Sequence, residues 1–316
     1  GVILSRVFYT MSLVGAVICW LILAGNMMAF MVPAVSARLW IIIFSSFLIP
    51  LCLLDDMSVL ARLSSVGVLC LIITMVCIAV GGVDALGDAQ IDRSADRLFP
   101  TNYKEAVIAL LMYMYPTAIP MVVPSLYGQM RNKDDFPKAI VRAHTIVLFI
   151  FLVITLTSFY GYYSALAEPA PSNIYLQMRS KVDNQMLVLG YVVCGTTCTS
   201  VLMSFPLVTN ALFTTYEKIC PETLNGNRVV HIIWRALAVS GIIITAIVGI
   251  GFFTPVIALI TSVGLIPISF MFPILIYCGA QAERSLDLMW AVVRRPFTAV
   301  FHTFIFIFAL LVMVQG

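Results

Sequence analysis

The sequence predicts an all-α polytopic membrane protein, and three observations support this fold class. Hydrophobic residues make up 61% of the 316-residue chain and charged residues only 10%, whereas a soluble domain is about 25% charged. The apolar residues gather in segments of about 20, the length at which a helix crosses a bilayer. No Asp, Glu, Lys or Arg stands clearly in the middle of any of these segments. Such a chain cannot cover its surface with polar groups, so lipid must solvate much of it.

About nine apolar segments are candidates for transmembrane helices. They are 8–32, 39–54, 65–83, 106–127, 140–164, 185–214, 231–252, 255–279 and 297–315. The second segment ends at Asp55 and Asp56. The sixth is long and contains Pro206, which predicts a kink or tilt because a proline inside a helix removes a backbone hydrogen bond. The connections between segments are too short to fold alone, so we predict a single transmembrane domain over residues 1–316.

The basic residues predict how the segments alternate across the membrane. If the start of the chain lies inside, the 18 Lys and Arg residues divide into 12 inside and 6 outside. This bias has the direction of the positive-inside rule. The start and the loops 131–138, 217–230 and 280–296 are then predicted on the cytoplasmic-equivalent side of an integral, multi-pass protein.

Several classes of function are disfavoured by the composition. The net charge of +3 indicates no nucleic-acid partner. The sequence has no nucleotide-binding loop, metal-protease motif or catalytic constellation, so we predict neither an enzyme nor a cofactor. Cys194 and Cys198 share a helix face, but without a neighbouring His or carboxylate they are interpreted as packing residues and not as a metal site. His302 is the main ionisable residue within a segment, which disfavours a proton pump with its own carboxylate relay.

Three prolines interrupt the fourth segment within nine residues: Pro116, Pro120 and Pro124. Backbone groups freed by such a helix break are tolerated in a membrane where protein buries them or where they line a water-filled cavity. Broken helices of this kind hold substrates and ions in many secondary transporters. An ordinary proline-kinked helix is the alternative, and composition leaves both open.

Two polar segments each have more than one possible role. The hydroxyl-rich run 195–200, followed by Ser204, can coordinate Na⁺ or bond a neighbouring helix, or its hydroxyls can bond carbonyls of their own helix. The charged segment 129–138 is either a solvated turn or a gate that clasps the inner face. The residues alone do not separate these alternatives.

Taken in order along the chain, these segments resemble those of the amino acid/auxin permease family. The run from Tyr115 to Pro120 resembles the family's sixth helix, where a His-Pro-x-x-x-Pro pattern is common. Segment 129–138 resembles its acidic-Met-basic-Asn-Pro-x-x-Phe inner loop. Weaker resemblances lie at 50–60 and 64–67 (fourth and fifth helices), 204–207 (eighth helix), and 258–264 with Pro273 (tenth helix). Tyr115 and Gln129 stand where many members have His and Glu.

The resemblance implies a fold of eleven helices, in which helices 1–5 and 6–10 form two inverted repeats. The nine segments then correspond to helices 3–11. Residues 8–83 would be the remainder of the first repeat, 106–279 the second repeat and 297–315 the final extra helix. Counterparts of the first two helices are missing from the sequence. It opens with Gly1 and without a signal-peptide pattern, which indicates upstream cleavage or a missing first segment.

The resemblance also implies site residues and a function. It implies a secondary-active or facilitative transporter of amino acids or similar small zwitterionic solutes, with H⁺ or Na⁺ as coupling ion and the lipid bilayer as surroundings. The alternative is a degenerate permease that serves, without transport activity, as a structural subunit beside other membrane proteins. The substrate-binding candidates are Tyr113, Tyr115, Thr117 and Ala118, and the cation-binding candidates are Thr199, Ser200 and Ser204.

Overall fold

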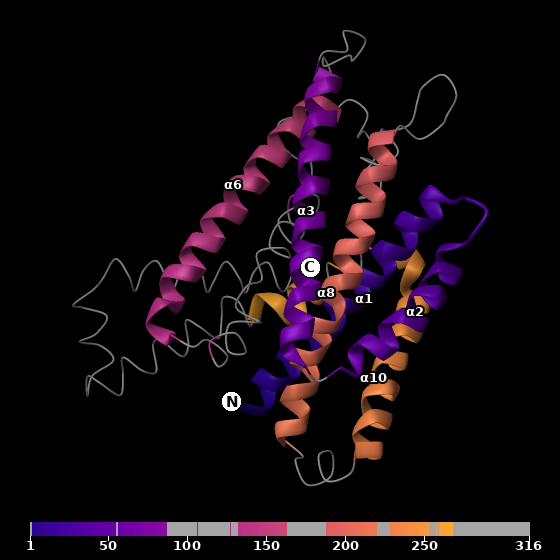
Figure 1. Ribbon diagram of the computed structural model, residues 1–316, viewed down its shortest axis with the longest axis vertical. Coiled ribbons are helices and arrows are strands. Elements are labelled where there is room, and N and C mark those ends of the chain that lie inside the picture. Colours follow the sequence, from indigo (N-terminus) through magenta and orange to yellow (C-terminus); the bar gives the residue numbers. More distant parts are fainter. Residues whose placement is uncertain are drawn as a thin grey trace. The chain divides into compact units, whose positions relative to one another are not determined.

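The computed structural model describes residues 2–54, 56–86, 106, 127, 132–162, 188–219, 228–252, 257 and 259–267. Over these residues the chain is helical and contains no strand, so the predicted all-α class is confirmed. The helices are α1 (Val2–Met31), α2 (Ala37–Cys52), α3 (Met57–Leu86), α6 (Phe136–Tyr162), α8 (Val188–Ile219) and α10 (Arg228–Gly249), as Figure 1 shows. Shorter elements are the 3-10 turns η3 (Lys133–Asp135) and η5 (Ile250–Phe252) and the π-helix η6 (Ile260–Leu265).

Five of the described helical stretches are long and apolar enough to cross a membrane. They are Arg6–Met31, Ser58–Asp84, Lys133–Ser158, Val188–Glu217 and Arg228–Phe252. The 16-residue α2 is apolar but shorter. The predicted segments 106–127 and 297–315, and most of 255–279, lie outside the described residues, so the number nine stays a prediction.

The predicted start of α3 was wrong by about two turns. The helix begins at Met57 and not at residue 65, because Asp56 caps it: the backbone N–H of Ser58 donates to Asp56 Oδ1 over 2.8 Å. An aspartate at this position satisfies one of the unpaired amides at a helix N-terminus. The first two turns contain Arg62 and the two serines Ser58 and Ser64, and these polar residues kept the turns out of a segment defined by apolar residues.

Two predicted loops are also shorter than expected. The helix α8 continues past Pro206 and past its predicted end at 214 to Ile219, and α10 already begins at Arg228, which shortens loop 217–230. In loop 131–138, Asn132 caps η3 by accepting from the Asp134 amide over 3.3 Å. The helix α6 follows directly, with Pro137 in its first turn, where a proline is tolerated.

The described helices belong to two compact units. Unit 1 comprises residues 1–16, 99–128 and 255–316, and unit 2 comprises 17–98 and 129–254. Within unit 1, the start of α1 packs closely on η6: a Cβ at Gly264 would lie 2.6 Å from Ser12 Oγ. The predicted division into inverted repeats stays a prediction.

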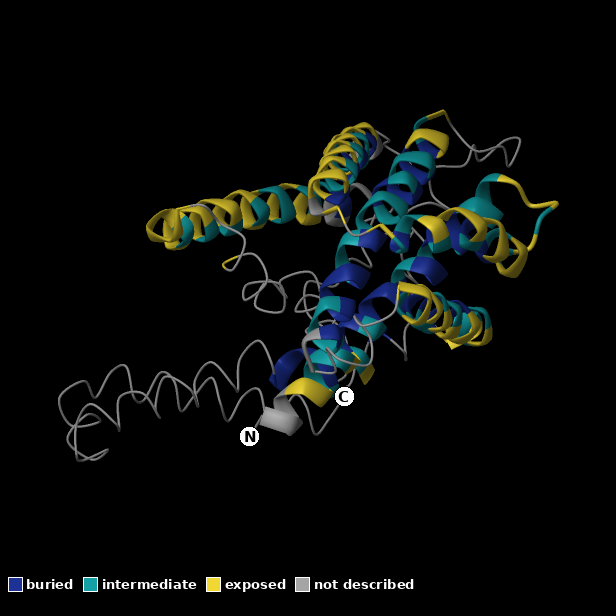
Figure 2. Ribbon diagram, turned by 60° about the horizontal axis from the view of Figure 1, so that its bottom comes forward, coloured by how far each residue is buried: buried dark blue, intermediate teal, exposed yellow. Residues whose placement is uncertain are grey.

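In unit 2, α8 lies at the centre of the helix packing. It contacts α3 along its length and α2 near its end, while α2 also packs on α10, and α6 packs on the opposite side of α3. Phe205 and Phe213 of α8 are fully buried, as is Ile41 of α2. In contrast, α6 exposes large apolar side chains such as Phe149 and Val141 along most of its length (Figure 2). In a membrane protein such a face is expected to meet lipid.

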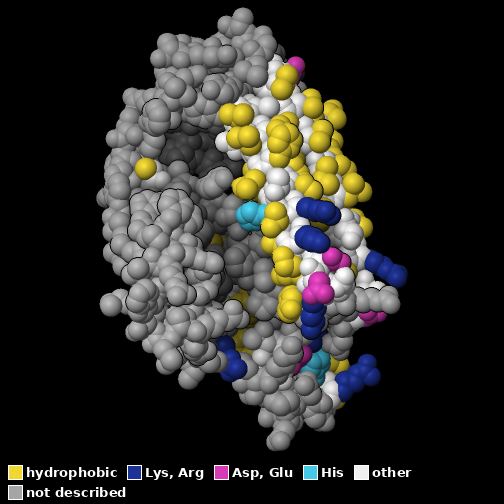
Figure 3. Space-filling view, turned by 90° about the vertical axis from the view of Figure 1, so that its left-hand side faces the viewer, with side chains coloured by type: hydrophobic (Ala, Val, Ile, Leu, Met, Phe, Trp, Pro, Cys, Tyr) yellow, Lys and Arg dark blue, Asp and Glu magenta, His cyan; other side chains and the backbone are white. Residues whose placement is uncertain are grey.

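Most of the basic side chains that the structure describes in unit 2 lie at one end. Cys52 of α2 contacts Thr209 of α8, and α3 runs antiparallel to α8. The starts of α3, α6 and α10 therefore share one end, which holds the exposed Arg62, Lys138, Arg142 and Arg228, while Arg38 and Asp84 lie towards the other. Figure 3 shows Lys and Arg in the lower half of one face, below a surface dominated by apolar side chains.

Candidate functional site

The predicted site residues divide into two groups. The substrate-binding candidates Tyr113, Tyr115, Thr117 and Ala118, and the helix-break prolines Pro116, Pro120 and Pro124, lie outside the described residues. Their assignment stays a prediction. The cation-binding candidates Thr199, Ser200 and Ser204 lie in the middle of α8, where the structure describes their surroundings.

Ser200 and Ser204 lie where α8 packs closely on Gly67 of α3. A Cβ at Gly67 of α3 would lie 2.9 Å from Ser204 Oγ, 3.0 Å from the Ser200 carbonyl oxygen and 3.3 Å from Met203 Cβ. Real Cβ contacts are rarely so short, so this approach depends on glycine at position 67. Small residues allow such close backbone packing between membrane helices.

Further along the same interface, three threonine hydroxyls form a short chain. Thr74 Oγ1 of α3 lies 2.7 Å from Thr196 Oγ1, and the Thr197 hydroxyl donates to Thr74 Oγ1 over 3.4 Å. Thr74 and Thr197 are buried. Hydroxyls that pair across a membrane interface stabilise helix association by about 0.6 kcal/mol on average. This chain therefore joins α3 and α8 in addition to the contact at Gly67.

Thr199 differs from its two companions. Its hydroxyl donates to the Gly195 carbonyl of its own helix over 2.8 Å, which is the local alternative that the sequence left open. The structure thus places the Ser204 hydroxyl and the Ser200 carbonyl oxygen against Gly67 of α3, and the Thr199 hydroxyl on its own backbone.

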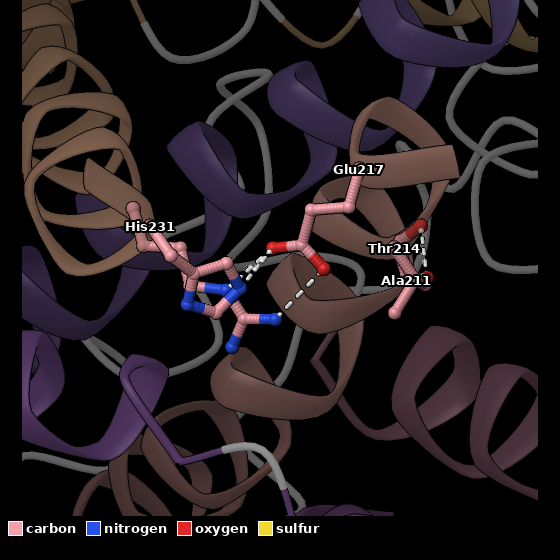
Figure 4. A network of polar contacts seen from close by, with 5 residues as sticks. Ala211, Thr214, Glu217 and His231 are labelled. Carbon is pink, nitrogen blue, oxygen red and sulfur yellow. Dashed lines mark hydrogen bonds and ion pairs between the residues drawn. The ribbon is translucent and has the colours of Figure 1, made fainter. Parts of the chain in front are cut away.

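A second polar cluster was missed by the sequence analysis. The guanidinium of Arg235 on α10 forms a two-pronged contact with Glu217 near the end of α8: Nε donates to Oε1 over 2.8 Å and Nη2 to Oε2 over 3.1 Å. His231, one turn earlier on α10, places Nε2 2.8 Å from the same Glu217 Oε1. Figure 4 shows the imidazole and guanidinium converging on one carboxylate. Glu217 lies just beyond the predicted segment 185–214 and Arg235 near the start of segment 231–252, so this pair stands at the ends of the predicted spans and not in their middle.

Aromatic and apolar side chains enclose this pair. Arg235 is only 2% exposed and Glu217 8%, and the Arg235 guanidinium lies 5.3 Å from the centre of the Phe213 ring. Tyr216 and Trp234 pack edge to face beside it, with ring centres 6.1 Å apart. A buried charge requires such pairing, because burial of an isolated ion is costly. The cluster therefore fastens the end of α8 to the start of α10.

No metal site built from His, Cys or carboxylate ligands is visible in the described part of the chain. Among those residues, no group of three or more His, Cys, Asp or Glu side chains is placed to hold a metal ion. Cys194 and Cys198 are free and buried within α8.

Comparison with known families decides how these helices are interpreted. The profile of the family described as "Transmembrane amino acid transporter protein" matches residues 1–316, which is the whole chain. The chain belongs to this family. The resemblance to amino acid/auxin permeases that the ordered motifs indicated is therefore confirmed.

Among curated members of the amino acid transporter family, the chain is similar to "Amino acid transporter AVT1D" of Arabidopsis thaliana. The two are 23% identical over 243 residues, which is 77% of this chain and 41% of the relative. The matched region thus spans less than half of that relative's length. No solved structure gives a significant match.

Proposed function

We propose that the protein is a transmembrane transporter of amino acids. The observation that carries the proposal is the family match over the entire chain, and the apolar helices are consistent with it. The similarity to a plant protein named as an amino acid transporter supports the same substrate class. Because no nucleotide-binding motif is present in the sequence, we infer a secondary-active or facilitative mechanism without an enzymatic step.

In this proposal, broken helices hold the zwitterionic substrate and α8 contributes to a site for a coupling cation. Tyr113, Tyr115, Thr117 and Ala118 remain our candidates for the substrate, near Pro116 and Pro120. For the cation we favour Ser200 and Ser204, because they lie together at the α3 contact while the Thr199 hydroxyl bonds its own helix.

We further propose that the basic end of unit 2 faces the cytoplasmic side, as the positive-inside rule predicts. The alternative function, a structural subunit without transport activity, gains no support from the comparisons.

Substrate binding tests the proposed site on α8. We expect the purified full-length protein to bind a radiolabelled amino acid in a scintillation proximity assay, and Ser204→Ala to raise the cation concentration needed for half-maximal binding. The required cation concentration rises because the substitution removes one neutral oxygen ligand from a site that has only a few ligands. Thr199→Ala is the matched control and is expected to leave the cation dependence unchanged.

Two outcomes count against this assignment. Equal cation dependence in Ser204→Ala and in the unmodified protein would remove Ser204 from the cation site while leaving transport intact as a proposal. A cation effect confined to Thr199→Ala would move the site to the other face of α8.

A further inference from the structure

Two buried hydroxyl groups in unit 1 have no role in the proposed transport site. Ser12 of α1 is 0% exposed, and so is Thr261 of the π-helix η6. Among the residues that the structure describes, neither Ser12 Oγ nor Thr261 Oγ1 has a hydrogen-bond partner. A buried polar group without a partner is rare and calls for an explanation, such as a bound ion or water. These two hydroxyls are therefore candidates for a binding site.

Neighbouring hydroxyls on the same two elements show what is unusual about this pair. Thr10, two residues before Ser12, donates to a carbonyl of its own helix over 2.8 Å. Ser262, directly after Thr261, donates to a carbonyl of the preceding turn over 3.2 Å. Such local bonds are the usual way in which a hydroxyl on a helix is satisfied. Ser12 and Thr261 do not use this local solution, so their oxygens remain available to a ligand.

The two hydroxyls belong to one close contact between helices. A Cβ at Gly264 would lie 2.6 Å from Ser12 Oγ and 3.2 Å from the Ser12 backbone nitrogen. At the other end of η6, a Cβ at Gly15 of α1 would overlap the Ile260 side chain. Thr261 directly follows Ile260 in this contact. The two glycines therefore let the backbone of η6 approach α1 closely, because small residues permit such packing between membrane helices.

The π-helical form of η6 changes how its backbone carbonyls are paired. The Ile266 amide donates to the Thr261 carbonyl, five residues back, whereas in an α-helix it would donate to the Ser262 carbonyl. The Ser262 carbonyl therefore does not receive this amide. Turns of π-helix are rare and frequently lie at functional sites. Carbonyls released from regular helix pairing can coordinate Na⁺ in membrane transporters.

We propose that Ser12 Oγ, Thr261 Oγ1 and backbone carbonyl oxygens of η6 bind a sodium ion between α1 and η6. Hydroxyl and carbonyl oxygens are ligands that hard cations accept. Neither α1 nor η6 contains Asp or Glu. Neutral oxygens alone suit a monovalent ion better than Ca²⁺, whose sites usually include carboxylates. The ion would give each of the two hydroxyl oxygens the partner that it lacks.

This sodium site is separate from the cation site proposed on α8 and does not rest on the proposed transport function. Ser12 and Thr261 belong to unit 1, whereas Ser200 and Ser204 belong to unit 2. The α8 candidates were chosen for their place at the contact with α3. Here the choice depends on unpartnered oxygens, which is an independent observation.

Thermal unfolding of the purified full-length protein in detergent tests for the ion without requiring transport. A Ser204→Ala background minimises any contribution from the cation site proposed on α8. When NaCl replaces N-methyl-D-glucamine chloride at constant ionic strength, we expect a saturable rise in Tm of about 2–4 °C. Ser12→Ala and Thr261→Val should each abolish the rise over the same range of Na⁺ concentration, because each removes a ligand. Thr10→Val is the matched control and should keep it, since its hydroxyl bonds its own helix.

The Tm without Na⁺ separates ion binding from a purely structural role. A hydroxyl that has no partner in the sodium-free protein contributes no hydrogen bond, so its removal costs little or stabilises. We therefore expect Ser12→Ala and Thr261→Val to unfold at or above the temperature of their parent when Na⁺ is absent. A marked drop in both would give the hydroxyls a structural role and contradict the proposal.

Two further results would overturn the sodium site. One is a parent Tm that is equal in the two salts, which would leave a water molecule as the occupant. The other is a rise with Na⁺ that persists in both Ser12→Ala and Thr261→Val. Binding of radioactive sodium to the folded Ser204→Ala protein guards against variants that fail to fold: we expect saturable binding, and its absence contradicts the proposal. A lack of amino acid uptake would leave these results unaffected and would count against the proposed function alone.

Discussion

Replacing Glu217 with leucine is expected to lower the free energy of unfolding by about 3–5 kcal/mol, the largest single effect that we predict. The substitution leaves the Arg235 guanidinium buried at 2% exposure without its carboxylate. It also removes the carboxylate oxygen that lies 2.8 Å from His231 Nε2. Denaturant titration in mixed micelles, followed by circular dichroism, measures the change.

The double variant Glu217→Leu, Arg235→Met tests whether the unpaired charge of Arg235 causes this destabilisation. When both partners of a buried ion pair become apolar, the change is often neutral or stabilising, because no unpaired charge remains. We therefore expect the second substitution to recover most of the loss, apart from the small cost of the unsatisfied His231. If the double variant is as unstable as the single one, an unpaired buried charge is not the cause, and our account of this cluster is wrong.

Gly82→Ala is expected to separate α3 from α6 and to destabilise the protein by about 1–3 kcal/mol, the cost of overpacking a tight contact. A Cβ at Gly82 would lie 2.6 Å from the Thr157 carbonyl oxygen and 2.8 Å from its carbon. These are backbone atoms of a helix, so they cannot move aside as a flexible side chain does. The whole of α6 must shift, and thermal unfolding in detergent measures the loss.

Gly241→Ala is the matched control, because it makes the same chemical change inside α10 where nothing lies within 4 Å of the added carbon. Alanine is favoured over glycine in a helix interior by about 0.5–1 kcal/mol. The two variants should therefore change stability in opposite directions. If both variants instead raised the stability by a similar amount, α3 and α6 would not approach each other as described.

Hydropathy was sufficient to predict the existence of most described helices, because about 20 apolar residues in a row leave few alternatives in a membrane. It was insufficient for helix ends. The extra turns of α3 before residue 65 depend on a cap from Asp56, and a window that counts apolar residues cannot detect a single hydrogen bond.

Contacts between helices were the harder problem. Glu217 and Arg235 are 18 residues apart and belong to different helices, so each alone is typical of a charged residue that ends a span. The hydroxyl run of α8 was visible as a polar stripe. Its partners Gly67 and Thr74 were not, since no spacing within α8 specifies which face meets α3. The predicted substrate residues around Tyr115 lie outside the described part, and their roles stay predictions.

Amino acid uptake by liposomes tests the central claim most directly. The purified full-length protein is reconstituted, the vesicles are loaded with a mixture of unlabelled amino acids, and entry of a trace of each labelled amino acid is followed as counterflow. Counterflow requires no assumption about the coupling ion. The account predicts saturable accumulation of at least one amino acid above that of protein-free liposomes. Folded protein, verified by circular dichroism, that accumulates none of them would contradict the assignment as a transporter.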